Sequence, residues 1–149
     1  MIQNPHGKPP GAANGVTHLI IKSRPESVKN ARDFVGLWFD AQGFDETAAG
    51  IAVIVASELV TNAHLHGTGE NDDITVRLYR SDAGPMIEVW DGGDDEPKMR
   101  HGGIDLESTS GRGLAMIDRI ACMWGYDFRV SGGKTVWALL CENYKEPAA

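Results

Sequence analysis

A short stretch in the middle of the chain places polar side chains within an apolar segment. Glu58 and Asn62 are four residues apart, so on a helix they share one face, and His66 follows one turn later while drifting around the axis. A carboxylate and an amide oxygen in this arrangement could orient a nucleophile and hold a hard cation such as Mg²⁺. Alternatively, these residues mark the point where the helix emerges into solvent. Spacing alone supports both interpretations equally.

A second group of interest, Asp91-Gly92-Gly93, directly follows an expected strand. A carboxylate at a strand end can accept a hydrogen bond from the amino group of an adenine, and glycines allow a flat ring to lie against the backbone. Asp-Gly pairs are also common turn formers. Taken alone, this motif favours a plain turn.

A third group, Gly111-Arg112-Gly113, opens an expected helix after a polar stretch that has no periodicity. Backbone N–H groups at such a helix start form an anion site, and Arg112 could add a charge-assisted contact. The alternative is a flexible hinge with a helix cap, because an isolated Gly-x-Gly is a weak signal. The polar stretch from Asp91 to Ser110 has the length of a lid, a binding loop or a disordered segment.

These groups need a scaffold, and the hydrophobic pattern predicts an α+β fold in which a mixed, mostly antiparallel sheet carries helices on one face. Ser23 and Glu26 form an expected capping box for the first helix, Asp45 caps the second, and Phe39 either packs in the core or serves a dimer or partner surface. The expected strands are 16–22, 74–80, 86–90, 124–130 and 135–141, and the expected helices follow Ser23, run from Asp45 to about His66, and begin near Leu114.

Composition limits the possible functions. The length of 149 residues fits one domain over 16–142, with tails at 1–15 and 143–149. A net charge of −7 argues against direct nucleic-acid binding. We see no signal peptide and no uninterrupted apolar run of about 20 residues, so we expect a cytoplasmic protein without a membrane partner. In that reducing compartment Cys122 and Cys141 are expected as small buried hydrophobes.

The order of these motifs resembles that of the GHKL, or Bergerat-fold, ATPases, and within them the anti-sigma-factor serine/threonine kinases. The resemblance covers about Val16 to Glu142 and includes Ser57–Ala63 with His66-Gly67, which resemble the N-box of the family. Asp91-Gly92-Gly93 and Gly111–Leu114 resemble its G1 and G2 boxes, and Gly133–Ala138 resembles its closing hairpin. A Bergerat-type two-layer sandwich is the fold that this resemblance implies.

The resemblance also implies a role for each matched residue. Glu58 would be the catalytic base or orienter toward a protein hydroxyl, and Asn62 would ligate the Mg²⁺ that bridges the ATP phosphates. Asp91 would accept from the adenine amino group, with Gly93 beneath the ring and Thr135 assisting through water. The phosphates would be contacted by Gly111, Arg112, Gly113 and His66.

In this family such a kinase sequesters a sigma factor and phosphorylates a STAS-domain anti-anti-sigma protein, and a homodimer is possible. The alternative is a non-catalytic ATP-binding module that sequesters a protein partner. Two departures from the family pattern bear on nucleotide affinity: Asp95 stands where the G1 box often has a second glycine, and Thr109 stands where the G2 box has a leading glycine.

Overall fold

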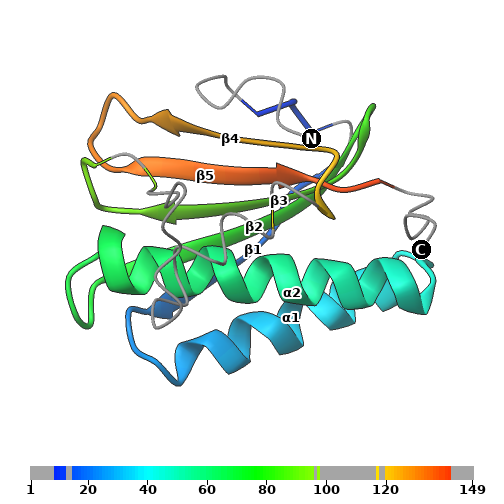
Figure 1. The fold of residues 1–149 in the computed structure, drawn as a ribbon, viewed down its shortest axis with the longest axis horizontal. Coiled ribbons are helices and arrows are strands. Elements are labelled where there is room, and N and C mark those ends of the chain that lie inside the picture. The colour runs from blue at the N-terminus through cyan, green and yellow to red at the C-terminus, as the bar shows by residue number, and fades with distance from the viewer. Residues whose placement is uncertain (1–8, 13–14, 96, 98–116, 118–119, 142–149) are drawn as a thin grey trace, which may run out of the picture.

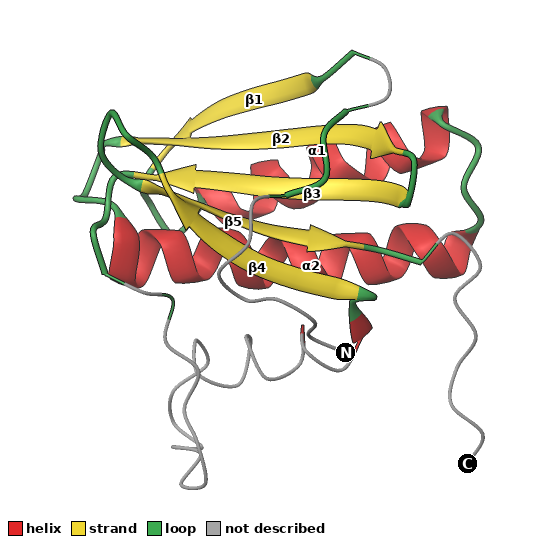
Figure 2. Ribbon diagram, turned by 90° about the horizontal axis from the view of Figure 1, so that it is seen from above, coloured by secondary structure: helices red, strands yellow, loops and turns green. Residues whose placement is uncertain are grey.

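The fold consists of two layers, a sheet and a pair of helices that cover one of its faces (Figure 1). The computed structural model describes residues 9–12, 15–95, 97, 117 and 120–141. Its strands are β1 (Thr17–Lys22), β2 (Asp73–Ser81), β3 (Gly84–Asp91), β4 (Met123–Phe128) and β5 (Lys134–Leu139). They form one sheet in the order β1-β2-β3-β5-β4, so that β1 and β4 are its edges (Figure 2). The predicted α+β sandwich is confirmed.

Every strand pair in this sheet is antiparallel, where a mixed, mostly antiparallel sheet was predicted. The two-residue turn between β2 and β3 and the hairpin between β4 and β5 account for two of the four pairings. The strands alternate with period two, so each has one side facing the helices and one facing away. The end of β3 therefore carries Asp91 on the same side as the buried Val89.

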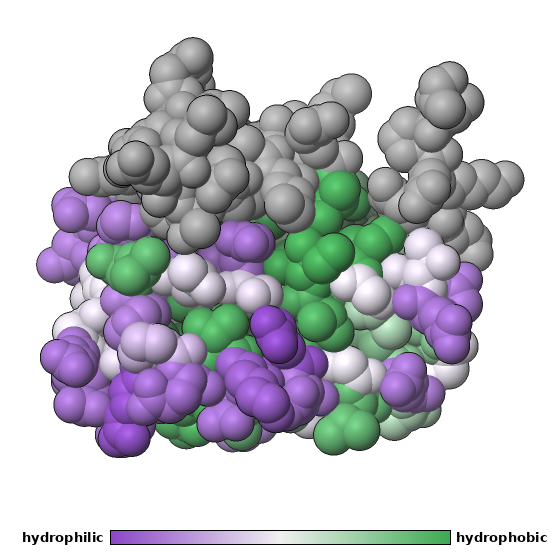
Figure 3. Space-filling model, turned by 60° about the horizontal axis from the view of Figure 1, so that its bottom comes forward, coloured by the Kyte–Doolittle hydropathy of each residue, from purple (hydrophilic) through white to green (hydrophobic). Residues whose placement is uncertain are grey.

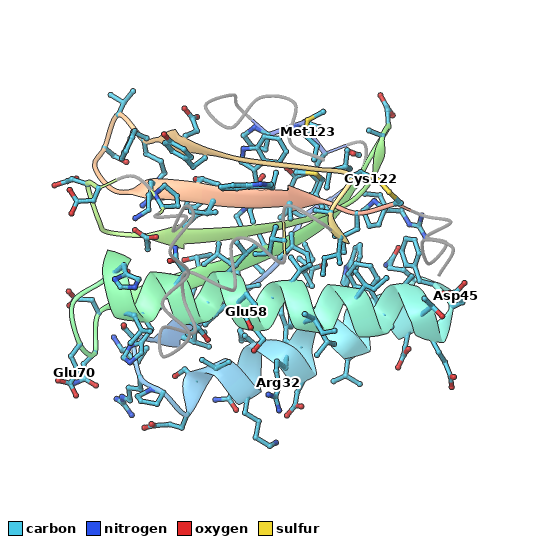
Figure 4. All side chains as sticks on the ribbon, viewed as in Figure 1. Arg32, Asp45, Glu58, Glu70, Cys122 and Met123 are labelled. Carbon is cyan, nitrogen blue, oxygen red and sulfur yellow. A yellow bond between two sulfur atoms is a disulfide. The ribbon has the colours of Figure 1, made fainter. Side chains whose placement is uncertain are left out.

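Helix α2 (Glu46–Asn62) lies against the centre of the sheet and positions the candidate site. Asp45 caps its N-terminus as predicted, because its carboxylate accepts from the Ala48 N–H at 2.8 Å. At its other end the helix widens into one π-helical turn, η1 (Ala63–Gly67). In Figure 4, Asp45 lies at the start of α2 and Glu70 lies just beyond the end of η1. Such π-turns within helices are frequent at functional sites.

The segment Glu46–Gly67 is apolar enough, and long enough, to pass a length-and-composition test for a membrane span. Core helices of globular proteins pass the same test, because a helix that is apolar on most sides is stable only when it is buried. Here Ala52, Val55, Ala56 and Leu59 belong to the core cluster that joins the helices to the sheet.

Helix α1 (Ser27–Ala41) packs beside α2 and does not begin with the predicted capping box. Its N-cap residue is Glu26, and no side chain caps the helix. Ser23 is instead fully buried, and its hydroxyl lies 2.8 Å from Nδ1 of His64 in η1. The Ser23 N–H also donates to the Asp72 carbonyl at 2.8 Å. The capping-box prediction was wrong because the Ser23 hydroxyl pairs with His64, a residue distant in sequence, and does not cap the helix.

Phe39 belongs to the core, which decides between its two predicted roles. It is 0% exposed, and its ring packs against Phe44 with the ring centroids 5.0 Å apart. The same face of α1 buries Ala31 and Val35. A surface for a partner must therefore use other residues.

The sheet face opposite the helices carries a second, smaller cluster made of Tyr79, Met86, Trp137 and Leu139. Glu88 lies beside it and is buried, yet its carboxylate is satisfied by Arg77 and Trp90, each at 2.8 Å, and by the Tyr79 hydroxyl. That hydroxyl, which has one proton to donate, also lies 2.7 Å from the Pro10 carbonyl. Burial, reinforced by the neighbouring Glu88 carboxylate, raises the pKa of Tyr79.

A disulfide joins Cys122, just before β4, to Cys141, just after β5, which corrects the expectation of two unpaired buried cysteines. The two Cα atoms are 5.6 Å apart, a normal spacing for such a bond. Neither cysteine is fully buried. The sequence separation of 19 residues concealed the pairing, because only the antiparallel register of β4 and β5 brings the two residues together.

We expect reduction of this bridge to lower the free energy of unfolding by about 3 kcal/mol, since the bond closes a loop of 19 residues in the unfolded chain. Urea unfolding with and without dithiothreitol measures the effect. Cys122→Ser should unfold at the midpoint of the reduced wild type and should not respond to dithiothreitol. An equal midpoint for the oxidised and reduced wild type would contradict the expectation.

Candidate nucleotide-binding site

Asn62 is the last residue of α2 and turns a polar side chain into the interior. It is 2% exposed, and its amide oxygen Oδ1 has no hydrogen-bond partner among the residues that the structure describes. Buried polar atoms are nearly always satisfied, so an unpaired one calls for a ligand or water. An amide oxygen is a ligand that Mg²⁺ accepts, and the arrangement therefore fits the magnesium role predicted for Asn62.

Asp91 is the last residue of β3, and its two carboxylate oxygens have different surroundings. Oδ1 accepts from the Gly93 N–H at 2.8 Å and from the Lys134 ammonium at 3.0 Å. Oδ2 is buried and has no partner within the described part of the chain. The residue as a whole is 1% exposed. One oxygen is thus held by the protein, while the other is left to accept a hydrogen bond, which fits the predicted contact with an adenine amino group.

Glycines allow the end of η1 to touch the end of β3. A Cβ at Gly67 would lie 2.5 Å from the Asp91 carboxyl carbon, and a Cβ at Gly93 would lie 2.5 Å from the Gly67 carbonyl oxygen. The Gly92 N–H donates to the Thr68 hydroxyl at 3.2 Å, which also links the two segments. The helix end with Asn62 and the strand end with Asp91, predicted separately from the sequence, are therefore neighbours in space.

The β4–β5 hairpin supports Asp91 from behind. Arg129 donates to the Asp91 carbonyl at 3.0 Å and to the Lys134 carbonyl at 2.6 Å. Its guanidinium also lies over the Trp90 ring, 4.9 Å from the centroid. Gly133 has φ of +78°, which favours glycine, and a Cβ there would collide with the Asp91 carbonyl oxygen. Sequence reasoning missed both Lys134 and Arg129.

The structure does not bring Thr135 to Asp91. Thr135 is opposite Trp90 in the β3–β5 register, and Lys134 is opposite Asp91. By strand alternation Thr135 shares a side with Trp137, whose cluster lies on the face away from the helices. Lys134 shares a side with Val136, which is in the core cluster next to the helices. The alternation of side chains along 134–138 could have predicted that Lys134 and Thr135 lie on opposite faces of the sheet.

For the remaining predicted site residues, the structure gives the position of Glu58 and His66 only. Glu58 lies on α2 one turn before Asn62 and is partly exposed (Figure 4), while His66 is exposed in η1. Gly111, Arg112 and Gly113 lie outside the described residues, as does most of the helix predicted after them, although Ile117 is helical and buried. Within the described ranges no three His, Cys, Asp or Glu side chains form a metal cluster.

Comparison with known proteins identifies the family of the chain. Residues 21–139 match the family described as the histidine kinase-like ATPase domain. Since this match spans most of the chain and includes both Asn62 and Asp91, the chain belongs to that family. No curated protein sequence matches the chain.

A solved structure has the same fold. It contains the RsbU and RsbW domains of Rv1364c from Mycobacterium tuberculosis, and it superposes with a TM-score of 0.64 at 20% sequence identity. The match covers 86% of this chain but only 32% of the other, so this chain corresponds to about a third of that protein's length.

The contact between Gly67 and Gly93 can be tested by adding one methyl group. We expect Gly93→Ala to weaken ATP binding roughly 10- to 100-fold, because the added Cβ would force the two backbone segments apart. Titration calorimetry with Mg-ATP measures the change. Gly92→Ala is the matched control: its Cβ would meet nothing within 4 Å. Equal losses in both variants would show that the close approach is unimportant for binding.

Proposed function

We propose that the chain is an ATP-dependent serine/threonine protein kinase of the anti-sigma-factor type. The observation that carries this proposal is a pair of buried oxygens, Asn62 Oδ1 and Asp91 Oδ2, which lie on adjoining segments and have no hydrogen-bond partner among the described residues. One fits the metal and the other fits the base of a single Mg-ATP molecule. The chain's membership of an ATPase family supports the proposal, as does the resemblance of its motifs to the anti-sigma-factor kinases.

In this proposal each end of the nucleotide has its own residues. Asp91 accepts from the adenine amino group, and Gly93 leaves room for the ring. Asn62 holds Mg²⁺, whose charge offsets that of the phosphates when the metal is bound. Backbone N–H groups of Gly111 and Gly113, with Arg112 and His66 nearby, complete the phosphate contacts in keeping with the family resemblance.

Glu58 is the candidate catalytic residue. It lies one helical turn from Asn62 on the same side of α2, so a protein hydroxyl that it orients would be near the metal end of the nucleotide. Its carboxylate would accept the hydroxyl proton as the hydroxyl oxygen bonds to the terminal phosphorus, and the bond from that phosphorus to the bridging oxygen would break to release ADP. Phosphoryl transfer depends mainly on positioning and charge stabilisation, so one such residue beside a well-held nucleotide is sufficient.

We further propose that the partners are a sigma factor, which the protein sequesters, and a STAS-domain anti-anti-sigma protein, which it phosphorylates, in the cytoplasm. The surface viewed from the helix side has apolar side chains gathered between polar ones (Figure 3). Large exposed apolar residues in the helical layer are Leu37, Ile54 and Leu65. Apolar surface of this kind supports binding of a protein partner.

Asn62→Ala should weaken Mg-ATP binding roughly tenfold or more, because the metal would lose its protein ligand. Calorimetric titrations with and without Mg²⁺ separate this effect from a general loss of affinity: only the magnesium-dependent part should fall. Asn30→Ala, on the exposed side of α1, is the control and should bind like the wild type. Unchanged magnesium dependence in Asn62→Ala would disprove the metal role.

Glu58→Gln should lower phosphate transfer to a STAS-domain protein by roughly 10²- to 10⁴-fold while leaving ATP affinity nearly unchanged, since the carboxylate acts on the hydroxyl. Labelled ATP incubated with STAS proteins of the same genome provides the assay. Glu70→Gln, at an exposed position, serves as the control. If the wild type binds ATP and labels no STAS protein, the non-catalytic binding module is the better description.

A further inference from the structure

We propose that Lys134 positions Asp91 as a hydrogen-bond acceptor and thereby makes the site selective for a purine that carries a 6-amino group. This inference rests on the proposed binding of ATP and names the residue that sets its base selectivity. Lys134 is a positioning residue in this scheme, because it acts on the base through Asp91.

Lys134 and Asp91 form an ion pair within the protein interior. They are directly opposite in the antiparallel register of β3 and β5, with Lys134 Nζ 3.0 Å from Asp91 Oδ1. Their side chains are 2% and 0% exposed. A lysine is almost never buried this completely unless its charge is paired. The buried Lys134 ammonium is thus paired with a single carboxylate oxygen, Oδ1 of Asp91.

The ion pair affects the two oxygens of Asp91 differently, as their hydrogen-bond donors show. Oδ1 already accepts from the Lys134 ammonium and the Gly93 N–H, whereas Oδ2 accepts from no described residue. A charged carboxylate can only accept, so its partner on a base must be a donor. The 6-amino group of adenine is a donor. The 6-oxo group of hypoxanthine or guanine is an acceptor and would leave two oxygens facing each other.

The Lys134 ammonium is the counter-charge of this buried carboxylate. A buried carboxylate without a counter-charge tends to be neutral, because burial penalises the ionised form. A neutral carboxyl group carries a proton, and it can donate that proton to a 6-oxo group. Removal of the Lys134 charge should therefore not only weaken the binding of a 6-amino purine but also admit a 6-oxo purine.

The hairpin geometry holds Lys134 in place for this task. Arg129 donates to the Lys134 carbonyl at 2.6 Å and to the Asp91 carbonyl at 3.0 Å, so it joins the two backbones beside the ion pair. Gly133, with its positive φ, lets the preceding turn approach the Asp91 carbonyl. The distance between ammonium and carboxylate is therefore fixed by backbone contacts as well as by attraction between the charges.

The experiment compares the affinities of Mg-ATP and Mg-ITP for the full chain by calorimetry. ITP has a 6-oxo group where ATP has its 6-amino group, and its N1 atom carries a hydrogen. Lys134→Met removes the charge and keeps an unbranched side chain of similar length. We expect it to weaken ATP binding roughly 10- to 100-fold and to bring the ATP-to-ITP affinity ratio down toward one. A merely structural role would weaken both nucleotides equally and leave the ratio unchanged.

Lys22→Met is the matched control. Lys22 also faces an aspartate, Asp73, across an antiparallel strand pair, but their side chains are 52% and 59% exposed. Its substitution should change neither affinity. Circular dichroism establishes that each variant is folded before the titrations are compared.

Asp91→Asn with and without Lys134→Met keeps the proposal testable if the single lysine variant does not fold. Once the carboxylate is an amide, removal of Lys134 should have no further effect on the ATP-to-ITP ratio. A further change in that ratio would overturn the proposal, as would a folded Lys134→Met variant that keeps the wild-type ratio. These results would leave the proposed function intact, whereas a wild type that binds neither nucleotide would refute both.

Discussion

The burial of one carboxylate, that of Asp91, imposes the tightest constraint on this structure. An ionised carboxylate is expensive to remove from water unless charge and hydrogen bonds compensate for the loss. The Lys134 ammonium and the Gly93 N–H provide that compensation at Oδ1. To bring both donors to one oxygen, the end of β3, the start of β5 and the turn after β3 must meet at a single point.

That meeting explains the glycines around the site. Gly67, Gly93 and Gly133 each have no room for a Cβ, because a neighbouring backbone or the Asp91 carboxyl group occupies the space. A Cβ at Gly92, which directly precedes Gly93, would instead meet no atom within 4 Å. Only some of the glycines in this region are therefore required by packing. The helix contributes as well, because its π-helical end brings Gly67 against Asp91 while Asn62 remains buried.

The sequence predicted the parts of the fold that depend on local pattern. The strands from Asp73 to Ser81 and from Gly84 to Asp91 alternate clearly, and Asp45 lies at the boundary where a helix cap is expected. The β4–β5 disulfide and the pairing of Ser23 with His64 were missed, because each joins residues that only the tertiary structure brings together.

In the predicted site, too, local sequence features could be predicted, whereas contacts that depend on the tertiary structure could not. Asn62 and Asp91 were predicted from the order of the motifs and the family resemblance, and the structure makes their segments neighbours. The partner of Asp91 was missed because it depends on the register between two strands. A shift of one residue exchanges the two faces of a strand, and this is why Lys134 lies beside Asp91 while Thr135 faces away.

The register also bears on how an acidic chain could bind an anionic nucleotide. With a net charge of −7, the protein as a whole repels ATP. The two cations beside Asp91 are already engaged, Lys134 with the carboxylate and Arg129 with two carbonyls and the Trp90 ring. They stabilise the base end of the proposed site and leave the phosphate end to other groups. In the proposed function, the negative charge of the phosphates is neutralised by the metal ion that Asn62 holds and by the Gly111–Gly113 segment. Base recognition and phosphate neutralisation are therefore assigned to separate parts of the chain.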